Sequence, residues 1–248
     1  MIVGKGLLAQ AFTPHFGTSP DIVIFASGVS NSLESRLEEF ERERALLLHS
    51  LSRGGGRFVY FSSCGVTAAE SELSLYMRHK RSMESLVLGT PGGLVLRLPQ
   101  VVGRTDNPHT LTNFLRNHIV SGEHFTVWAQ AERNLVDIDD VVKIGVRLTN
   151  EPPIGVTAIS IAAARSSPMP HIVKIFERVL GRSANCSFVQ KGAPMVIDTA
   201  LVESLSAKLS IDLGDGYIDR VIERYYAPSL YGGAGDATTD SNAWTTSS

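Results

Sequence analysis

Short apolar runs alternate with longer amphipathic stretches along the first hundred residues, and this order limits the fold more than any other feature of the chain. The apolar runs cover residues 1–4, 21–27, 57–63 and 93–99, and a fifth follows at 155–162. The stretches with a helical period between them cover residues 6–12, 31–53 and 70–88. Continuous apolar runs are typical of strands that are buried on both faces. Their alternation with helices predicts an α/β protein in which helices flank both sides of a parallel sheet.

The second half of the chain is more mixed. Helical periods recur at residues 110–122, 137–150, 169–181, 196–211 and 214–230. After Tyr231 the sequence is poor in core residues and rich in Gly, Ser and Thr, so residues 232–248 are expected to form a disordered tail. We therefore expect a single folded domain at residues 1–231.

Charge and composition exclude several classes of protein. The formal net charge is -2, so no basic field points to nucleic acid as a partner. The apolar runs are shorter than the ~18 residues of a membrane span, and the N-terminus lacks the basic region of a signal peptide. Cys64 and Cys186 lack metal-ligand spacing and Asp139 and Asp140 lack a third ligand, so we predict no metal site. The cysteine usage fits a reducing, cytoplasmic setting.

A glycine-rich turn separates the first apolar run from the first helical stretch. Gly4, Gly6 and Ala9 form G-x-G-x-x-A there, a pattern that lets a backbone approach a pyrophosphate at a helix N-terminus. Glycines that simply punctuate a strand–helix turn are the alternative. The apolar run at 21–27 follows almost at once, so the usual second and third strands of a dinucleotide-binding sheet have no room. The adenosine end of the pocket should be reduced, and the first strand should lie near a sheet edge where a partner chain could pair.

Tyr76 and Lys80 stand four positions apart in the stretch 70–88, which places them on one face of a helix. The ordinary pKa of a phenol is about 10, and a nearby ammonium favours the phenolate and lowers that pKa. A tyrosine tuned in this way can exchange a proton with a sugar or alcohol oxygen. Ser62 and Ser63 end the preceding strand, where ligands bind in open parallel sheets. An exposed Tyr–Lys pair and a plain serine turn are the alternative interpretation.

The order of these motifs resembles the extended branch of the short-chain dehydrogenase/reductase superfamily, the NAD-dependent nucleotide-sugar epimerases, dehydratases and 4-keto reductases. A strand that ends in Ser precedes Y-x-x-x-K, and residues 94–115 and 132–142 are similar to the family segments R-x-x-N-x-x-G and R-x-x-x-x-V-x-D. The resemblance runs to about residue 230. It implies a Rossmann-like parallel sheet without the usual second and third strands, and a small C-terminal substrate lobe built from residues 104–135 and 164–231.

The resemblance also implies roles for particular residues. Tyr76 would be the catalytic acid/base, Lys80 would lower its pKa and bind the nicotinamide ribose, and Ser63 would hold the reacting oxygen, with Ser62 as the close alternative. The cofactor, NAD or NADP, would be bound by Gly4, Gly6, Ala9, Ala26, Ser27, Gly28, Ser62, Tyr76, Lys80 and Pro99. The substrate would be bound by Ser63, Gln100 and Arg133, because a guanidinium suits a diphosphate.

The function that this resemblance implies is an NAD(P)-dependent oxidoreductase or epimerase acting on a nucleotide-activated sugar. Dehydratases of the family use an acid/base pair directly after the catalytic Ser/Thr, whereas Cys64 and Gly65 stand there in this chain. That difference favours 4-keto reduction or epimerisation. The reduced adenosine pocket leaves a non-catalytic nucleotide- or sugar-binding member as an alternative, and a small-molecule carbonyl reductase is another. The first strand near a sheet edge is compatible with a homodimer, and the sequence leaves the number of subunits open.

Overall fold

The structure is a computed structural model that describes residues 1–54, 56–151, 155 and 157–228. The tail predicted at 232–248 and Tyr231 lie outside the described residues. No helix in the described part of the chain is long and apolar enough to cross a membrane. The described cysteines, Cys64 and Cys186, are both free thiols.

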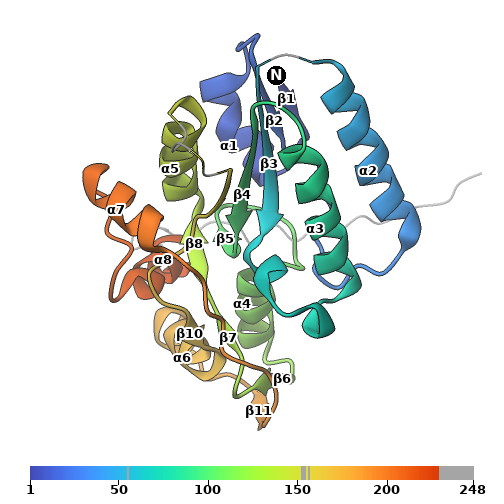
Figure 1. Cartoon of the computed structure of the whole chain (residues 1–248). Coiled ribbons are helices and arrows are strands. Elements are labelled where there is room, and N and C mark those ends of the chain that lie inside the picture. Colours follow the sequence, from blue (N-terminus) through green and yellow to red (C-terminus); the bar gives the residue numbers. More distant parts are fainter. Residues whose placement is uncertain (55, 152–154, 156, 229–248) are drawn as a thin grey trace, which may run out of the picture.

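A parallel sheet of five strands forms the centre of the protein (Figure 1). Its strand order is β1 (Ile2–Val3), β2 (Ile22–Phe25), β3 (Arg57–Ser63), β4 (Gly93–Leu98) and β9 (Ala158–Ser160). All four strand pairings are parallel. The prediction of a Rossmann-like parallel sheet with a shortened N-terminal part is confirmed, because β1 pairs directly with β2 and lies at the edge.

Helices cover both faces of this sheet (Figure 1). One face carries α1 (Leu7–Phe16) and α5 (Ile138–Asn150), and the other carries α2 (Leu37–Ser52) and α3 (Leu75–Leu88). Helix α1 continues through Pro14, beyond the end at residue 12 that the sequence indicated. The extra turn forms because Phe12 and Phe16, on the same helix face, are both buried in the core.

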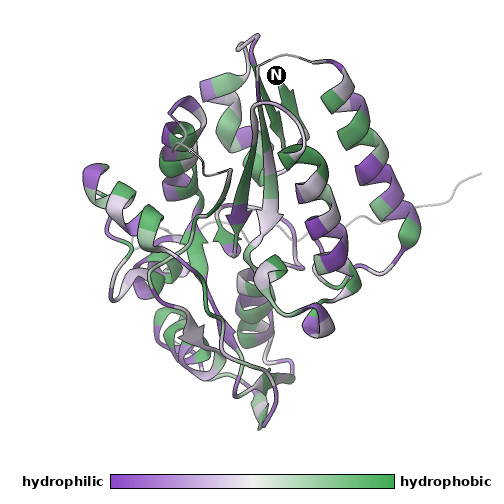
Figure 2. Ribbon diagram, viewed as in Figure 1, coloured by the Kyte–Doolittle hydropathy of each residue, from purple (hydrophilic) through white to green (hydrophobic). Residues whose placement is uncertain are grey.

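Alternate residues of the strands feed two hydrophobic clusters, as the pleat of a β-strand requires. On β3, Val59 and Phe61 belong to the larger cluster, whereas Phe58 and Tyr60 belong to the cluster shared with α2 and α3. In Figure 2, most of the length of the sheet strands has the hydrophobic colour. Hydrophilic residues lie on the outer faces of the helices. A sheet buried on both faces explains why its strands read as continuous apolar runs.

The remaining elements lie beyond the carboxyl ends of the sheet strands (Figure 1). The helices are α4 (Leu111–Ser121), α6 (Met169–Leu180), α7 (Ala200–Lys208) and α8 (Tyr217–Tyr226). The short strands pair as β5 (Gln100–Val102) with β8 (Leu135–Asp137), β6 (Phe125–Trp128) with β11 (Cys186–Val189), and β7 (Glu132–Arg133) with β10 (Ser167–Pro168). Apart from β5 and β8, these elements come from the segments 104–135 and 164–231, for which a substrate lobe was predicted.

Polar contacts attach α8 to the start of α5. Asp137 caps α5 through the N–H of Asp139, and its carboxylate also accepts hydrogen bonds from Arg224 and from the Tyr225 hydroxyl. The Tyr217 hydroxyl donates to Asp140. Helix α8 is thereby held against the start of α5.

Candidate active site

The turn that follows β3 brings Ser63 to the first turn of α3. Ser63 caps a short 3-10 helix (Cys64–Thr67) by accepting the N–H of Gly65 at 3.2 Å. A methyl group placed on Gly65 would come within 2.5 Å of the Met77 side chain. Helix α3 itself begins after Ser74, whose hydroxyl accepts the N–H of Met77. Ser63 is therefore close to the helix turn that carries Tyr76.

Tyr76 and Lys80 share one face of α3, as predicted. The Lys80 ammonium lies 5.8 Å from the centre of the Tyr76 ring and 5.0 Å from that of the Tyr60 ring. Tyr76 is 8% exposed and Lys80 3% exposed. The exposed Tyr–Lys pair considered as an alternative is thereby excluded. The Tyr76 hydroxyl donates no hydrogen bond to any residue of the described chain, so its proton is free for a ligand.

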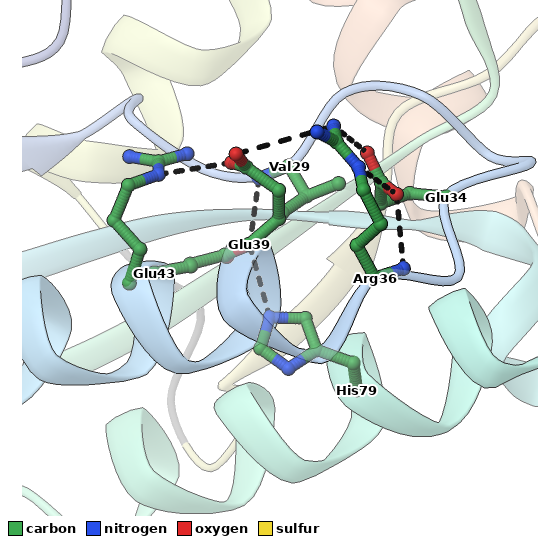
Figure 3. A network of polar contacts seen from close by, with 7 residues as sticks. Val29, Glu34, Arg36, Glu39, Glu43 and His79 are labelled. Atoms are coloured by element: carbon green, nitrogen blue, oxygen red, sulfur yellow. Dashed lines mark hydrogen bonds and ion pairs between the residues drawn. The ribbon is translucent and has the colours of Figure 1, made fainter.

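Lys80 is bound to a carboxylate that the sequence analysis did not single out. Its ammonium donates to Glu43 of α2 at 3.1 Å, and Glu43 is completely buried. The same carboxylate accepts the Val29 N–H at 2.6 Å and the Tyr60 hydroxyl at 2.7 Å. His79 Nε2 lies 3.0 Å from it (Figure 3). Neighbouring residues of a helix are expected to point away from each other, but the side chains of His79 and Lys80 both reach Glu43.

The pKa shifts in this cluster follow from burial and from the Glu43 charge. Burial by itself would raise the pKa of Glu43, but the His79 contact, the Lys80 charge and two hydrogen bonds outweigh it and lower that pKa to about 2. Burial, and then the charge of Glu43, raise the pKa of Tyr76 well above its ordinary value. Burial lowers the pKa of Lys80, while Glu43 opposes that effect. The expectation that Lys80 lowers the pKa of Tyr76 is wrong for this structure, because burial, and then the charge of Glu43, raise that pKa while Glu43 pairs with the Lys80 ammonium.

Two glycine-containing turns meet beside Lys80. Gly4 has a φ of +132°, and a methyl group on it would come within 2.4 Å of the Ala26 carbonyl oxygen. Gly28 ends the turn after β2 that also contains Ser27, and a methyl group on Gly28 would lie 2.4 Å from the Lys80 nitrogen. The predicted pyrophosphate turn and the Ala26–Gly28 turn are thus brought to one place, and Lys80 is brought there too.

The residues around these turns suit a dinucleotide. Gly6 precedes α1 without any side-chain cap, and a methyl group on Gly6 would meet no heavy atom within 4 Å. Unclaimed N–H groups at an open helix start bind phosphate well. Ala9 is buried where α1 packs on the sheet. On β3, the Ser62 hydroxyl is buried without a partner among the described residues, which is unusual unless a ligand or water supplies one.

The predicted substrate residues lie farther along the chain. Pro99 and Gln100 follow β4, and Gln100 begins β5. Arg133 ends β7, where it is half-buried and donates to the Glu132 carbonyl oxygen. Burial lowers the pKa of Arg133, and no acidic side chain of the described residues pairs with it. A desolvated guanidinium without a carboxylate partner suits an anionic ligand.

A cavity of about 390 Å³ opens next to the glycine turn, between the sheet part and α8. Leu7 and Gln10 of α1 line it together with Arg104, Arg224 and Tyr225. None of the residues predicted to bind cofactor or substrate is among its lining residues. Arg104 is exposed and lies within residues 94–115, the stretch that resembles R-x-x-N-x-x-G, but the sequence analysis did not single it out.

The family model described as "NAD dependent epimerase/dehydratase family" matches residues 7–162, which is more than half of the chain. The chain belongs to this family. Among curated protein sequences, none is similar enough to match this chain.

Solved structures of epimerases show the same fold. The UDP-N-acetylglucosamine 4-epimerase of Bacillus cereus superposes with a TM-score of 0.64 at 14% identity, over 95% of this chain and 96% of the epimerase. The UDP-glucuronic acid 4-epimerase of Bacillus cereus, in complex with UDP-glucuronic acid and NAD, gives a TM-score of 0.63 at 18% identity, over 90% of this chain and 77% of that one. RMD of Pseudomonas aeruginosa, complexed with NADPH, gives a TM-score of 0.63 at 16% identity, over 84% of this chain and 82% of RMD.

One feature of this member of the epimerase/dehydratase family, the buried carboxylate of Glu43, was not indicated by the sequence motifs. Glu43 lies in a run of acidic and basic residues that is typical of an exposed helix face, so the sequence analysis passed over it. The available signal was Phe40 three positions earlier, because positions i and i+3 share a helix face. Phe40 is buried and stacks on His79 with ring centres 4.6 Å apart.

Proposed function

We propose that this chain is an NAD(P)-dependent oxidoreductase or epimerase that acts on a nucleotide-activated sugar. The observation that carries the proposal is the buried Tyr76, whose free hydroxyl lies on the same helix face as Lys80, beside the carboxyl end of β3. Ligands of open parallel sheets bind at that end. The UDP-sugar named with the Bacillus cereus epimerase of the same fold supports the substrate class.

The proposed chemistry divides between the cofactor and the chain. A bound nicotinamide supplies or accepts the hydride at the sugar carbon. Ser63 donates its hydroxyl hydrogen to the reacting oxygen, and Tyr76 passes a proton to that oxygen or takes one from it. Lys80 would bind the nicotinamide ribose, and Ser27 and Gly28 would contact the cofactor beside it. In a reductase the oxidised cofactor leaves after each turnover, whereas an epimerase keeps and reuses it.

The two residues after Ser63 support a reductase or an epimerase over a dehydratase. Burial raises the pKa of the Cys64 thiol to about 12, so Cys64 stays neutral at physiological pH. Gly65 has no side chain. A dehydratase needs an additional acid and base to remove water, and neither residue can act as one.

The proposed substrate site lies beyond the carboxyl ends of the sheet strands, in the segments 104–135 and 164–231. Arg133 would bind the diphosphate of the nucleotide through two parallel hydrogen bonds. Gln100 would contact the same group. A homodimer in a reducing, cytoplasmic compartment belongs to the same proposal, supported by the exposed edge at β1 and the free thiols.

A non-catalytic nucleotide-binding protein is the second candidate, and the Lys80–Glu43 contact favours it. An ammonium held by a buried carboxylate has fewer free donors for a ribose. The free Tyr76 hydroxyl favours the enzyme, because a protein that only binds has no need for an unpaired phenol in a buried position.

Native mass spectrometry of the purified protein tests both candidates. A co-purifying dinucleotide or nucleotide sugar supports the proposal. Turnover is then measured with NADH or NADPH and a set of UDP- and dTDP-4-keto sugars, and with UDP-sugars for epimerisation. In that assay Tyr76→Phe should lower turnover by about a hundredfold or more while cofactor affinity stays nearly unchanged. Full turnover by Tyr76→Phe would exclude the role given to this residue.

A further inference from the structure

Glu43 of α2 contacts groups from three other parts of the fold. Its carboxylate accepts from the turn after β2 through Val29, from β3 through Tyr60, and from α3 through Lys80, while His79 of α3 lies at its second oxygen. Figure 3 shows Val29 and His79 approaching it from opposite sides. Nothing in the proposed hydride and proton transfers uses this residue.

Stability alone does not explain a charged pair at this position. Burying two ions carries a large desolvation penalty, and well-packed apolar side chains of similar volume often serve the fold as well. The surroundings are suited to such apolar residues, since Val29, Phe40 and Tyr76 form a hydrophobic cluster there. A buried ionised group beside an unpaired phenol therefore points to a function for that charge.

We propose that Glu43 is a positioning residue of the active site, which fixes the Lys80 ammonium against the Gly28 turn and, by neutralising that ammonium, keeps Tyr76 in its protonated form. This inference rests on the proposed function and deepens it, because it names the group that sets the charge state of the proposed catalytic pair.

The position of Lys80 follows from contacts on two sides. Gly28 leaves no room for even a methyl group between its backbone and the ammonium. Glu43 binds the ammonium from α2, and the Tyr60 and Tyr76 rings lie 5.0 Å and 5.8 Å away. The lysine side chain, 4% exposed, is held in one place before any ligand arrives.

Among the described residues, the buried cations nearest Tyr76 are paired with acids. Lys80 is paired with Glu43, and the next buried acid of α3, Glu84, is paired with Arg97 of β4 at 2.6 Å. His79 contacts Glu43 itself. The burial of Tyr76 and the charge of Glu43 both raise the pKa of Tyr76. At physiological pH the residue is a phenol with a proton to give.

Donation by this phenol suits carbonyl reduction. The O–H bond of Tyr76 breaks and its proton forms the new O–H bond on the substrate oxygen, while the carbonyl carbon receives a hydride from the reduced nicotinamide cofactor. The Tyr76 phenolate then regains a proton from solvent.

Ionisation of Tyr76 in the protein without cofactor or substrate tests the inference. The chain contains six tyrosines, so Tyr76 is followed by carbon-13 NMR of labelled tyrosine rings and assigned by its loss in Tyr76→Phe. Glu43→Gln keeps the shape of the side chain and removes the charge. We expect Tyr76 to titrate at least about one pH unit lower in Glu43→Gln than in the wild type, a tenfold larger acid dissociation constant. Glu43→Asp, which keeps the charge, should restore a titration close to that of the wild type.

Glu84→Gln is the matched control, because it also removes a buried carboxylate of the same fold but one that is paired with Arg97. Tyr76 should titrate in Glu84→Gln as in the wild type. The inference is overturned if Tyr76 titrates at the same pH in Glu43→Gln and in the wild type. It is also overturned if Tyr76 shows no titration in either protein over the pH range measured.

A second comparison covers the case in which Glu43→Gln does not fold. Lys80→Met is compared with the double variant Glu43→Gln/Lys80→Met, which leaves no unpaired buried charge at the pair. Tyr76 should titrate at a lower pH in the double variant than in Lys80→Met. The same titration pH in both variants would contradict the inference. These titrations contain no cofactor, so a negative result would contradict only the role of Glu43. The proposed function is tested separately by NADH binding and turnover.

Discussion

Gly28 lies directly against the ammonium group of Lys80. A methyl group built on Gly28 would come within 2.4 Å of the Lys80 nitrogen and 2.9 Å of the Glu43 carboxylate. The turn after β2 and the helix after β3 therefore meet without space between them, at the point where the glycine turn before α1 also arrives. This contact joins the proposed cofactor-binding turns to the proposed catalytic pair.

Gly28→Ala should destabilise the protein, because the added methyl group has to displace the buried Lys80–Glu43 pair. The expected loss is roughly 1–3 kcal/mol, as for overpacking of other cores. Unfolding in urea, followed by circular dichroism, measures it. Gly6→Ala is the control: its methyl group meets no protein atom, so stability should change little, whereas NADH affinity should fall about tenfold. Equal stability of both variants would contradict the packing at Gly28.

The pH dependence of reduction should reflect a tyrosine that stays protonated. Burial and Glu43 raise the pKa of Tyr76 above its ordinary value of 10.0, and the protonated form is the active one. The activity should therefore be fully present at neutral pH and lost only as pH rises through the raised pKa. We expect kcat/KM for reduction to stay level up to about pH 10. A decline with a midpoint near pH 7 or 8 would show that the phenol is instead easily ionised.

Glu43 should make stability depend on pH in the acidic range. Its pKa is lowered from 4.5 to about 2 in the folded protein, so its contribution is present above pH 4.5 and is lost as pH falls toward 2. Glu43→Gln should cost on the order of 3 kcal/mol at pH 7 and progressively less toward pH 3. Urea unfolding at several pH values measures the difference.

Glu39→Gln is the matched control for that series. Glu39 lies one turn earlier on α2 and pairs with Arg42 in a more exposed position. Its replacement should change stability by less than about 0.5 kcal/mol at every pH. A loss from Glu43→Gln that does not vary with pH would contradict the assignment of an ionised, hydrogen-bonded carboxylate.

Arg133→Lys should weaken the binding of a nucleotide diphosphate by about tenfold, because a lysine cannot form two parallel hydrogen bonds to phosphate. Isothermal titration calorimetry with UDP as the probe gives the affinity. Arg147→Lys is the control, since Arg147 lies on α5 and pairs with the exposed Glu151. UDP affinity that is unchanged in Arg133→Lys would remove Arg133 from the substrate site.

The sheet could be predicted from the sequence because local signals determine it. The run that became β3 is apolar from Phe58 to Phe61, and Ser74 provides an N-cap signal just before α3. The helical period alone then places Tyr76 and Lys80 on one face of the helix. The pairing of β5 with β8 could not be predicted, since each strand has three residues and distant parts of the chain set the partner.

The charge state of the site could not be predicted, because it depends on groups from separate elements. The sequence shows Lys80 near Tyr76, but only the fold brings Glu43 of α2 to within 3.1 Å of the ammonium. A charged run such as the one around Glu43 looks the same whether one of its residues is exposed or buried. The direction of the Tyr76 pKa shift was therefore wrong in the sequence analysis, while the placement of Tyr76 and Lys80 on one face was right.

Titration of the protein with NADH and NADPH, followed by the fluorescence of the reduced nicotinamide, tests most directly whether this site is a dinucleotide-dependent active site. We predict saturable binding of at least one of the two cofactors below millimolar concentration, weakened about tenfold in Gly6→Ala. Absence of binding of both cofactors up to millimolar concentration would contradict the account.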